Sequence, residues 1–187
     1  MAVEEPKYTV VAKDGPFEIR DYPGTVVAEV DVDGDRQAAT SVGFRLLAGY
    51  IFGGNAGAKS VAMTAPVAQT RTGVKIAMTA PVSLSGNADN WLVQFTMPSA
   101  YSLDDLPTPN DPRVRLRSVP PRRLAVAKFS GLTREPAVSR QTSKLQAFLG
   151  ERGLSPTGTP ILARYDPPWT PWFMRRNEVM LAVLRGP

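Results

Sequence analysis

The chain has 187 residues, 43% of them hydrophobic, and 22 Lys and Arg against 17 Asp and Glu give it a formal charge of +5. This length fits one domain with a core of its own, and the positive charge alone is compatible with nucleic acid, an anionic membrane or an acidic small molecule. Cysteine and histidine are both absent, which excludes disulfides, cysteine nucleophiles, the Ser-His-Asp triad, and metal sites built on thiolate or imidazole ligands.

The first part of the chain predicts three strands followed by a helix. Runs rich in β-branched and aromatic residues predict strands at residues 8–12, 17–22 and 25–32. Asp33-Gly34-Asp35 offers a turn and a helix N-cap, and apolar residues then recur at helical spacing from Arg36 to Phe52. Gly53-Gly54-Asn55 is typical of a helix end.

A six-residue segment then occurs twice. Ala62–Val67 reads Ala-Met-Thr-Ala-Pro-Val and returns as Ala77–Val82. Two copies are too few for a solenoid, so we expect two matching edge strands joined by a turn near Thr72-Gly73. Because proline is confined to strand edges, bulges and strand starts, we expect irregular pairing at Pro66 and Pro81.

The second part predicts a strand at 91–97, a loop at 98–112, and a hairpin of 113–119 and 124–129 across Pro120-Pro121. The first strand of this hairpin carries arginines at alternate positions, which indicates one buried face and one face of arginines. No motif of a nucleic-acid-binding module accompanies these arginines, so we interpret them as a solvated face.

Thr133 is the expected N-cap of a second helix, with Pro136 in its first turn. The apolar stripe of this helix consists of Val138, Leu145, Phe148 and Leu149, and Gly150 and Gly153 mark its end. Strands at 161–165 and 178–184, separated by a loop at 166–174, complete the chain. The order of strands, helix and strands occurs twice, which predicts an α+β fold with an antiparallel sheet or distorted barrel and helices packed outside.

Five segments, in this order, resemble the SOUL/haem-binding protein family. They are Phe17–Tyr22, Phe44–Asn55, the doubled Met-Thr-Ala-Pro-Val, Phe95–Pro98 and Tyr165–Val179. The resemblance covers residues 8–184 and implies a single domain over residues 1–187. It also implies a distorted eight-stranded antiparallel β-barrel made of two pseudo-repeats and flanked by two α-helices.

The resemblance implies non-covalent binding of haem or a related tetrapyrrole in an apolar groove, as a carrier, buffer or sequestering protein. In this sequence the groove falls on the first helix and on the loop before the last strand. The matching residues are Ser41, Phe44, Leu47, Ala48 and Ile51 of the helix, and Trp169, Thr170, Trp172 and Phe173 of the loop. The family's basic groove positions align with uncharged Ser41, Gly49 and Thr170, so we expect the nearby Arg45, Arg175 and Arg176 to bind the haem propionates instead.

Histidine is not available as an axial ligand, and the alternatives are methionine and tyrosine. Met63, Met78 and Met174 are candidates, although methionine is typical of core gaps, and Tyr50 is expected at a helix end with its hydroxyl at the surface. We therefore expect haem to bind without a strong axial ligand from the protein, or no cofactor at all. The aromatic loop residues also fit a second interpretation, in which they cap the core.

Other functions remain open at this point. One is a binding module for a different small amphipathic ligand, resembling the effector-binding domains of bacterial regulators; acidic groove residues would favour this alternative, whereas arginines favour a tetrapyrrole. Two others are an interaction protein that uses the first helix, and an enzyme that modifies its ligand. No pair of acidic residues has a spacing typical of catalysis, so we expect a non-enzymatic binding protein. We also expect a cytoplasmic monomer without nucleic-acid binding and without a membrane span.

Overall fold

The computed structural model describes residues 4–56, 73–87, 89–167 and 169–184. This part of the chain folds into a large antiparallel sheet with two α-helices, as the α+β prediction requires. The strands are β1 (Thr9–Asp14), β2 (Phe17–Tyr22), β3 (Thr25–Asp33), β4 (Asn55–Ala56), β5 (Val82–Asn87), β6 (Asn90–Thr96), β7 (Thr108–Pro109), β8 (Arg115–Val119), β9 (Arg122–Ser130), β10 (Pro156–Arg164) and β11 (Arg176–Val183). The helices are α1 (Arg36–Ile51), α2 (Glu135–Gly150) and the short 3-10 helix η1 (Trp172–Met174).

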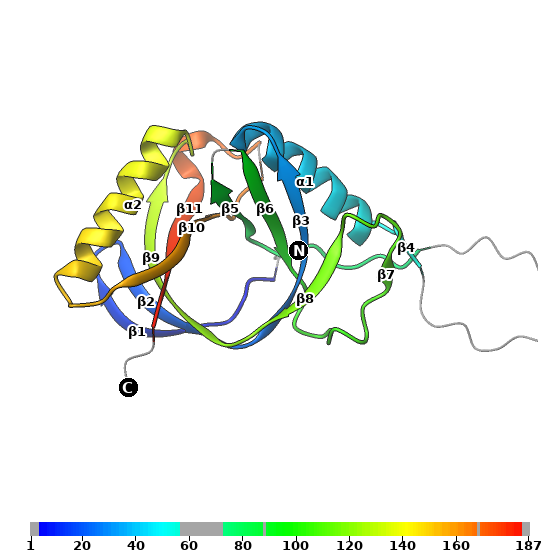
Figure 1. Cartoon of the computed structure of the whole chain (residues 1–187), viewed down its shortest axis with the longest axis horizontal. Helices are drawn as coiled ribbons and strands as arrows, with labels where there is room; N and C mark the ends of the chain where they lie inside the picture. The colour runs from blue at the N-terminus through cyan, green and yellow to red at the C-terminus, as the bar shows by residue number, and fades with distance from the viewer. Residues whose placement is uncertain (1–3, 57–72, 88, 168, 185–187) are drawn as a thin grey trace, which may run out of the picture.

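Nine of the described strands form one sheet in the order β1-β2-β9-β11-β10-β5-β6-β3-β8, while β4 and β7 pair separately. The two sides of the central β10–β5 pair repeat one pattern. On one side β3 leads through α1 to β5 and β6, and on the other β9 leads through α2 to β10 and β11. This pattern supports the two predicted pseudo-repeats. Figure 1 shows the sheet curved like an arch, with both helices on its outer side.

The predicted closure into an eight-stranded barrel is not confirmed. Closure requires the two outermost strands of a sheet to pair with each other. Among the described strands, β1 pairs with β2 and β8 pairs with β3, so these two strands form separate edges of an open sheet. The sheet is therefore larger than predicted and remains open.

Helix α1 begins where the sequence predicts. The carboxylate of Asp35 accepts hydrogen bonds of 2.9 Å from the backbone N–H groups of Gln37 and Ala38, which satisfies two otherwise unpaired donors of the first turn. The helix packs against β3 and β6, and Gly43 allows its close approach. A Cβ atom at Gly43 would lie 2.4 Å from a methyl group of Val93 on β6.

Helix α2 buries the predicted stripe of Val138, Leu145, Phe148 and Leu149 against β9, β10 and β11. Its N-cap differs from the prediction, because the cap residue is Arg134, which makes no side-chain cap hydrogen bond. Thr133 forms hydrogen bonds to other elements instead of capping the helix. Its hydroxyl accepts a hydrogen bond from Arg164 and its carbonyl accepts one from Arg36, so it joins the start of α2 to β10 and α1.

The predicted hairpin of 113–119 and 124–129 is wrong. Strand β8 pairs with β3 at one edge, whereas β9 lies between β2 and β11 in the other half. Pro120-Pro121 has no backbone N–H donors and favours an extended chain, so the segment crosses between halves instead of turning back. The arginines of β8 meet acids on β3: Arg115 lies 2.6 Å from Asp31 and Arg117 lies 3.0 Å from Glu29.

The duplicated segment is only half described, since its first copy lies outside the described residues. The second copy does not form the predicted edge strand. Strand β5 begins only at Val82 and is central, between β10 and β6. Ahead of it, the hydroxyl of Thr79 donates to the carbonyl of Thr96 and the backbone of Thr79 bridges to Glu4.

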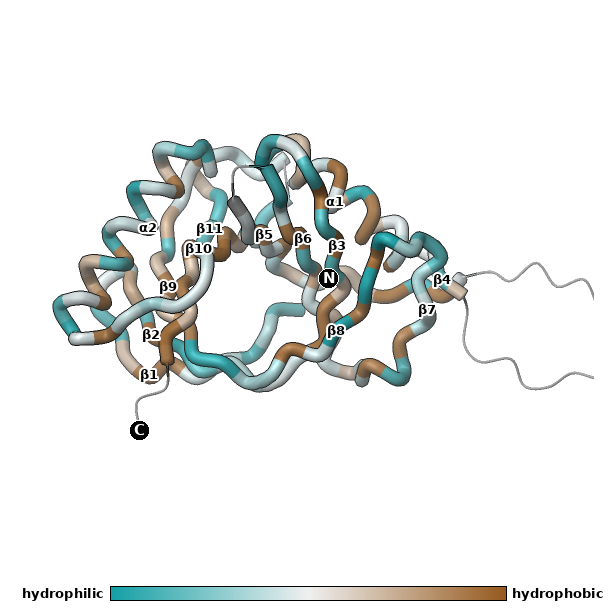
Figure 2. Tube along the Cα trace, in the orientation of Figure 1, coloured by the Kyte–Doolittle hydropathy of each residue, from teal (hydrophilic) through white to brown (hydrophobic). Residues whose placement is uncertain are grey.

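The main hydrophobic core lies between the helices and the outer face of the sheet. Figure 2 shows mainly hydrophilic residues along the outward turns of α2, whereas the outward turns of α1 are mixed and its exposed residues include Val42 and Phe44. The inner face of the sheet carries a smaller apolar cluster around Leu124 and Met180, next to a network of buried charges that includes Arg20 and Glu178. Among the described residues, no helix combines the length and the apolar character needed to span a bilayer.

Candidate ligand-binding site

The loop between β10 and β11, which we call the aromatic loop (residues 165–175, described apart from 168), exposes four large apolar side chains. Their exposed fractions are 83% for Trp169, 58% for Trp172, 60% for Phe173 and 64% for Met174. Large apolar side chains exposed together in one loop often mark a binding site. These exposures contradict the interpretation that the side chains are part of the core, and the predicted groove stays a prediction.

The backbone of the aromatic loop explains why these side chains point outward. Prolines prevent regular strand pairing here, and tight turns replace it. The N–H of Thr170 donates to the carbonyl of Pro167 at 3.0 Å, and the N–H of Met174 donates to Pro171 at 2.9 Å. The guanidinium Nε of Arg175 also donates to the carbonyl of Thr170 at 2.8 Å, which ties the end of the loop to its middle.

Within the aromatic loop, the rings of Trp172 and Phe173 meet edge to face, with centroids 5.7 Å apart. Trp172 also lies beside Gly131, where a Cβ atom would be 4.0 Å from the indole. Gly131 is fixed in turn, because its carbonyl accepts a 3.0 Å hydrogen bond from the amide of Asn177. The loop aromatics are thus held against the end of β9.

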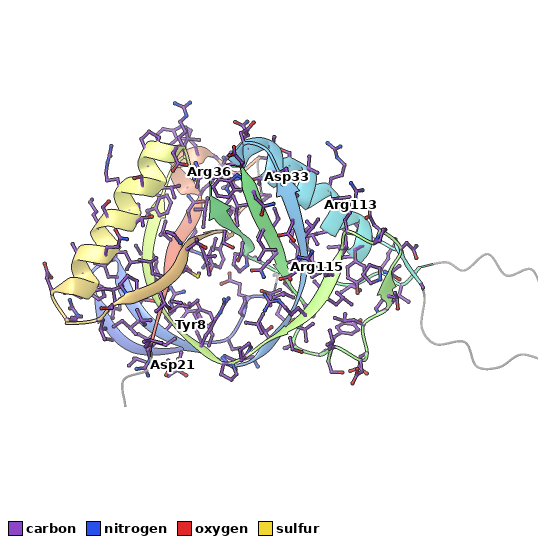
Figure 3. The ribbon with its side chains drawn as sticks, viewed as in Figure 1. Tyr8, Asp21, Asp33, Arg36, Arg113 and Arg115 are labelled. Atoms are coloured by element: carbon purple, nitrogen blue, oxygen red, sulfur yellow. The ribbon has the colours of Figure 1, made fainter. Side chains whose placement is uncertain are left out.

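Three arginines, which we call the arginine cluster (Arg36, Arg164 and Arg175), gather near Thr133. Arg36 donates to the Thr133 carbonyl at 2.6 Å, and Arg164 donates to the Thr133 hydroxyl. Burial lowers the pKa of Arg164, and the neighbouring Arg36 and Arg175 lower it further. Figure 3 labels Arg36 between the upper ends of the two helices.

The arginine cluster carries an excess of positive charge. Arg36 pairs with Glu135 at 3.2 Å, and the Glu135 side chain is 73% exposed, so this acid lies at the surface of the cluster. Mutual repulsion of partly buried guanidinium groups is relieved when an anion binds between them. The cluster therefore suits a carboxylate or phosphate ligand group.

The predicted residues of α1 divide into two sets. Ser41, Phe44 and Arg45 are exposed and Ala48 is half-buried, whereas Leu47 and Ile51 lie in the core at 0% and 1% exposure. Phe44 packs edge to face on Phe95 of β6, with ring centroids 5.4 Å apart. Among the described residues, no ring contact joins Phe44 to the aromatics of the loop. Leu47 and Ile51 can support a binding surface here but do not form one.

The candidate iron ligands that the structure describes lie in different parts of the molecule. Tyr50 is 2% exposed and donates its hydroxyl to the Pro107 carbonyl at 2.9 Å, so the expected surface hydroxyl is wrong. Met78 packs against the core, and Met63 lies outside the described residues. Of these candidates, Met174 is the one that lies in the aromatic loop with its side chain exposed.

Sequence reasoning missed Arg36, Arg164 and Thr133. Arg36 reads as the first residue of a helix and Arg164 as a strand residue, and neither position carries a local signal of binding. Only the sheet order brings the end of β10 beside the start of both helices. Arg176, one of the residues expected to bind a propionate, pairs with Glu5 at 2.6 Å, and the nearby Glu178 pairs with Arg20 at 2.9 Å.

Comparisons with known proteins identify the family and the fold. Residues 3–182 match the family model described as SOUL heme-binding protein. Heme-binding protein 1 of Xenopus tropicalis is 29% identical over 170 residues, which cover 89% of this chain and 84% of that protein.

Two solved structures show the same fold. The C-terminal domain of EcmrR superposes with a TM-score of 0.66 at 10% identity, over 96% of this chain and 99% of that one. A protein of Listeria innocua described as a hydrolase superposes with a TM-score of 0.60 at 14% identity, over 93% and 94% of the two chains.

Proposed function

Because this chain belongs to the SOUL heme-binding protein family, we propose that it binds haem or a related tetrapyrrole non-covalently between the aromatic loop and the exposed face of α1. The observation that carries the proposal is the aromatic loop itself, with four exposed apolar side chains beside three arginines. Haem has a matching structure, with apolar faces and two carboxylates at one edge. The role is that of a carrier, buffer or sequestering protein.

Each part of the proposed site has a separate task. Trp169, Trp172 and Phe173 stack on or border the ring and remove it from water. Arg164 and Arg175 pair with the propionates through charge-assisted hydrogen bonds. When bound, haem supplies iron chemistry of its own, and this chain contributes binding, orientation and partial exclusion of water.

The arginines decide between this proposal and the alternative of a cationic amphiphile at the same surface. A hydrophobic cation needs unpaired carboxylates, but the described acid beside the cluster, Glu135, is paired with Arg36. An anionic amphiphile is favoured instead, and a tetrapyrrole is the anionic amphiphile that the family match supports.

The test is a titration of the purified protein with hemin, followed by the Soret absorbance, with protoporphyrin IX in parallel. We expect saturation at one equivalent and similar affinity for both, because the site offers iron no strong ligand. Trp172→Ala should weaken hemin binding about tenfold, since roughly 1.5–3 kcal/mol accompanies burial of a large apolar side chain.

A matched control is Phe52→Ala, because Phe52 is 60% exposed, like Trp172, but lies at the other end of α1. The Phe52 variant should bind hemin like the parent. Equal losses in both variants would indicate non-specific adsorption to exposed aromatics, and a strong preference for hemin over protoporphyrin would show that a side chain binds iron.

A further inference from the structure

A cavity of about 430 Å³, which we call the inner cavity, lies on the face of the sheet opposite the helices. This volume falls within the ~300–1,000 Å³ range of small-molecule sites. Its walls come from both halves of the fold: the β2–β3 connection, the end of β8, the start of β9, the segment after β6, and residues 4–7. Tyr165, the first residue of the aromatic loop, lines the inner cavity, but the exposed Trp169, Trp172 and Phe173 do not, so the cavity is separate from the exposed aromatic surface.

The walls of the inner cavity are mostly apolar or aromatic. Leu124 and Met180 belong to the apolar cluster of the inner face, with Tyr22 and Tyr165 packed against them. The two tyrosine hydroxyls are already engaged. Tyr165 donates to Glu178 at 2.6 Å, and Tyr22 accepts a 2.9 Å hydrogen bond from Arg20. Both hydroxyls thus bond to the buried charge network, and the rings pack against Leu124 and Met180.

The acids around the inner cavity are engaged as well. Glu5 pairs with Arg176 at 2.6 Å, and Glu4 accepts a 3.0 Å hydrogen bond from the backbone N–H of Ser99. Behind the wall, Arg20 neutralises Glu178 through two hydrogen bonds of 2.9 Å. A cationic ligand would find these carboxylates already occupied.

Arg122 is the exception to this pairing. It lines the inner cavity, it is only partly exposed, and no described carboxylate lies within ion-pair distance of it. Burial lowers the pKa of Arg122, as expected for a guanidinium that has lost water without gaining a counter-ion. Another cation, Arg117, lies close enough to lower the pKa of Arg122 although Tyr22 raises it, and Arg117 is itself paired with Glu29 at 3.0 Å. Lys7 adds a second cation to the lining.

We propose that the inner cavity is a second ligand site, specific for a small amphipathic carboxylate whose charged group pairs with Arg122 and whose apolar part packs on Leu124, Met180 and the tyrosine rings. An unpaired, partly buried guanidinium gains most from an anion that forms two parallel hydrogen bonds. The cavity walls then select for an apolar body. This site goes beyond tetrapyrrole binding and does not depend on it.

The test compares three ligands that share one chain length, decanoate, decanol and decyltrimethylammonium, by isothermal titration calorimetry with the full chain. Decanoate should bind at one equivalent, about tenfold or more tightly than decanol, because it adds a charged hydrogen bond to the same apolar contacts. The cation should bind more weakly than the alcohol. Equal affinity of decanoate and decanol would overturn the proposal, and this result needs no variant.

Variants then locate the site. Arg122→Gln should weaken decanoate binding about tenfold and leave decanol unchanged, whereas Arg122→Lys should retain part of the preference. Arg123→Gln is the matched control, because the neighbouring Arg123 pairs with Asp21 at 2.7 Å and does not line the cavity. A loss of decanoate affinity in Arg123→Gln equal to that in Arg122→Gln would contradict the assignment.

Hemin titrations of the same variants separate the two sites. Arg122→Gln should bind hemin like the parent, and Trp172→Ala should bind decanoate like the parent. If decanoate competes with hemin and both variants lose both ligands, one shared site exists and the inner-cavity proposal is wrong. If hemin fails to bind anywhere while decanoate retains its dependence on Arg122, only the tetrapyrrole proposal fails.

Discussion

The guanidinium of Arg20 on β2 donates two hydrogen bonds of 2.9 Å to the carboxylate of Glu178 on β11, across the intervening strand β9. The two side chains are 0% and 2% exposed. Arg20 also donates to Glu18 at 2.7 Å, and Lys128 of β9 donates to the same Glu18 at 2.7 Å. The network thus ties three adjacent strands together and balances two buried carboxylates against two cations.

Arg20→Met should destabilise the protein strongly, because it leaves Glu178 without its cation in a buried position. Breaking a buried pair in this way costs about 3–5 kcal/mol. The free energy of unfolding in urea, measured at neutral pH, checks this value. Arg113→Met is the control, since Arg113 pairs with Asp111 at 2.7 Å with 63% of its side chain exposed, and exposed pairs contribute about 0–1 kcal/mol. Similar losses in the two variants would contradict the role assigned to burial.

Two glycines of α1 should respond in opposite directions to alanine. Gly43→Ala places a Cβ atom 2.4 Å from Val93, so helix or strand must shift, at a cost of about 1–3 kcal/mol. Gly49 is exposed and has nothing within 4 Å of the same position, so Gly49→Ala should stabilise by about 0.5–1 kcal/mol. Thermal unfolding of both variants measures the contrast. Stabilisation by Gly43→Ala would show that α1 does not pack this closely.

Acid should weaken the fold through carboxylates that are ionised and paired. Burial alone would raise the pKa of Glu29, but hydrogen bonds from Arg117 and Gln94 outweigh it and lower the pKa below the usual 4.5. Because the folded pKa is the lower one, this contribution is present above pH 4.5 and disappears as the pH falls through the folded pKa. The pKa of Glu18 is lowered in the same way, by Lys128 and Arg20 against burial.

The free energy of unfolding should therefore fall as the pH decreases below about 4.5. Glu29→Gln removes one titrating group and should make this fall less steep, although it lowers stability at neutral pH. Glu151→Gln, at the exposed C-cap of α2, is the control for replacing one carboxyl group by an amide. A Glu29→Gln slope identical to that of the parent would show that Glu29 has the same pKa in both states.

Local signals in the sequence predicted much of the fold. The cap at Asp35 and the buried stripe of α2 depend on residues a few positions apart, and both are confirmed. Pairing between strands that are distant in the sequence was harder to predict. Pro120-Pro121 resembles a hairpin turn, but β8 finds its acidic partners on β3, more than 80 positions earlier in the chain. The barrel prediction failed to be confirmed for the same reason, because the number of strands does not determine which strands pair and which lie at the edges of the sheet.

In the candidate site too, residues with a local sequence signal could be predicted, whereas residues brought together by the fold could not. The aromatic residues of the loop could be predicted as site residues from the sequence, because they cluster among prolines. Arg36 and Arg164 do not, since each is an ordinary residue of its own element until the sheet order brings them to Thr133. Leu47 and Ile51 were predicted as groove residues but are buried in the core. The apolar face of this helix is broad, so the sequence alone does not show which of its apolar residues face the core.

The arginine cluster leads to a last prediction about tetrapyrrole binding. If Arg164 pairs with a propionate, Arg164→Gln should weaken hemin binding about tenfold, the usual effect of losing one charged hydrogen bond. The same variant should bind the dimethyl ester of protoporphyrin IX as tightly as the parent does, because the ester has no carboxylate to lose. Fluorescence quenching of the loop tryptophans measures both affinities.

Arg140→Gln is the control for this prediction. Arg140 is an exposed residue of α2, and its substitution removes one positive charge away from the cluster. An equal loss of hemin affinity in Arg140→Gln would show that overall charge, and not the cluster, attracts the ligand. A parallel loss for the ester in Arg164→Gln would point to a change in the loop, because Arg164 also holds Thr133 at the start of α2. Only a loss confined to the free carboxylates assigns the propionates to the arginine cluster.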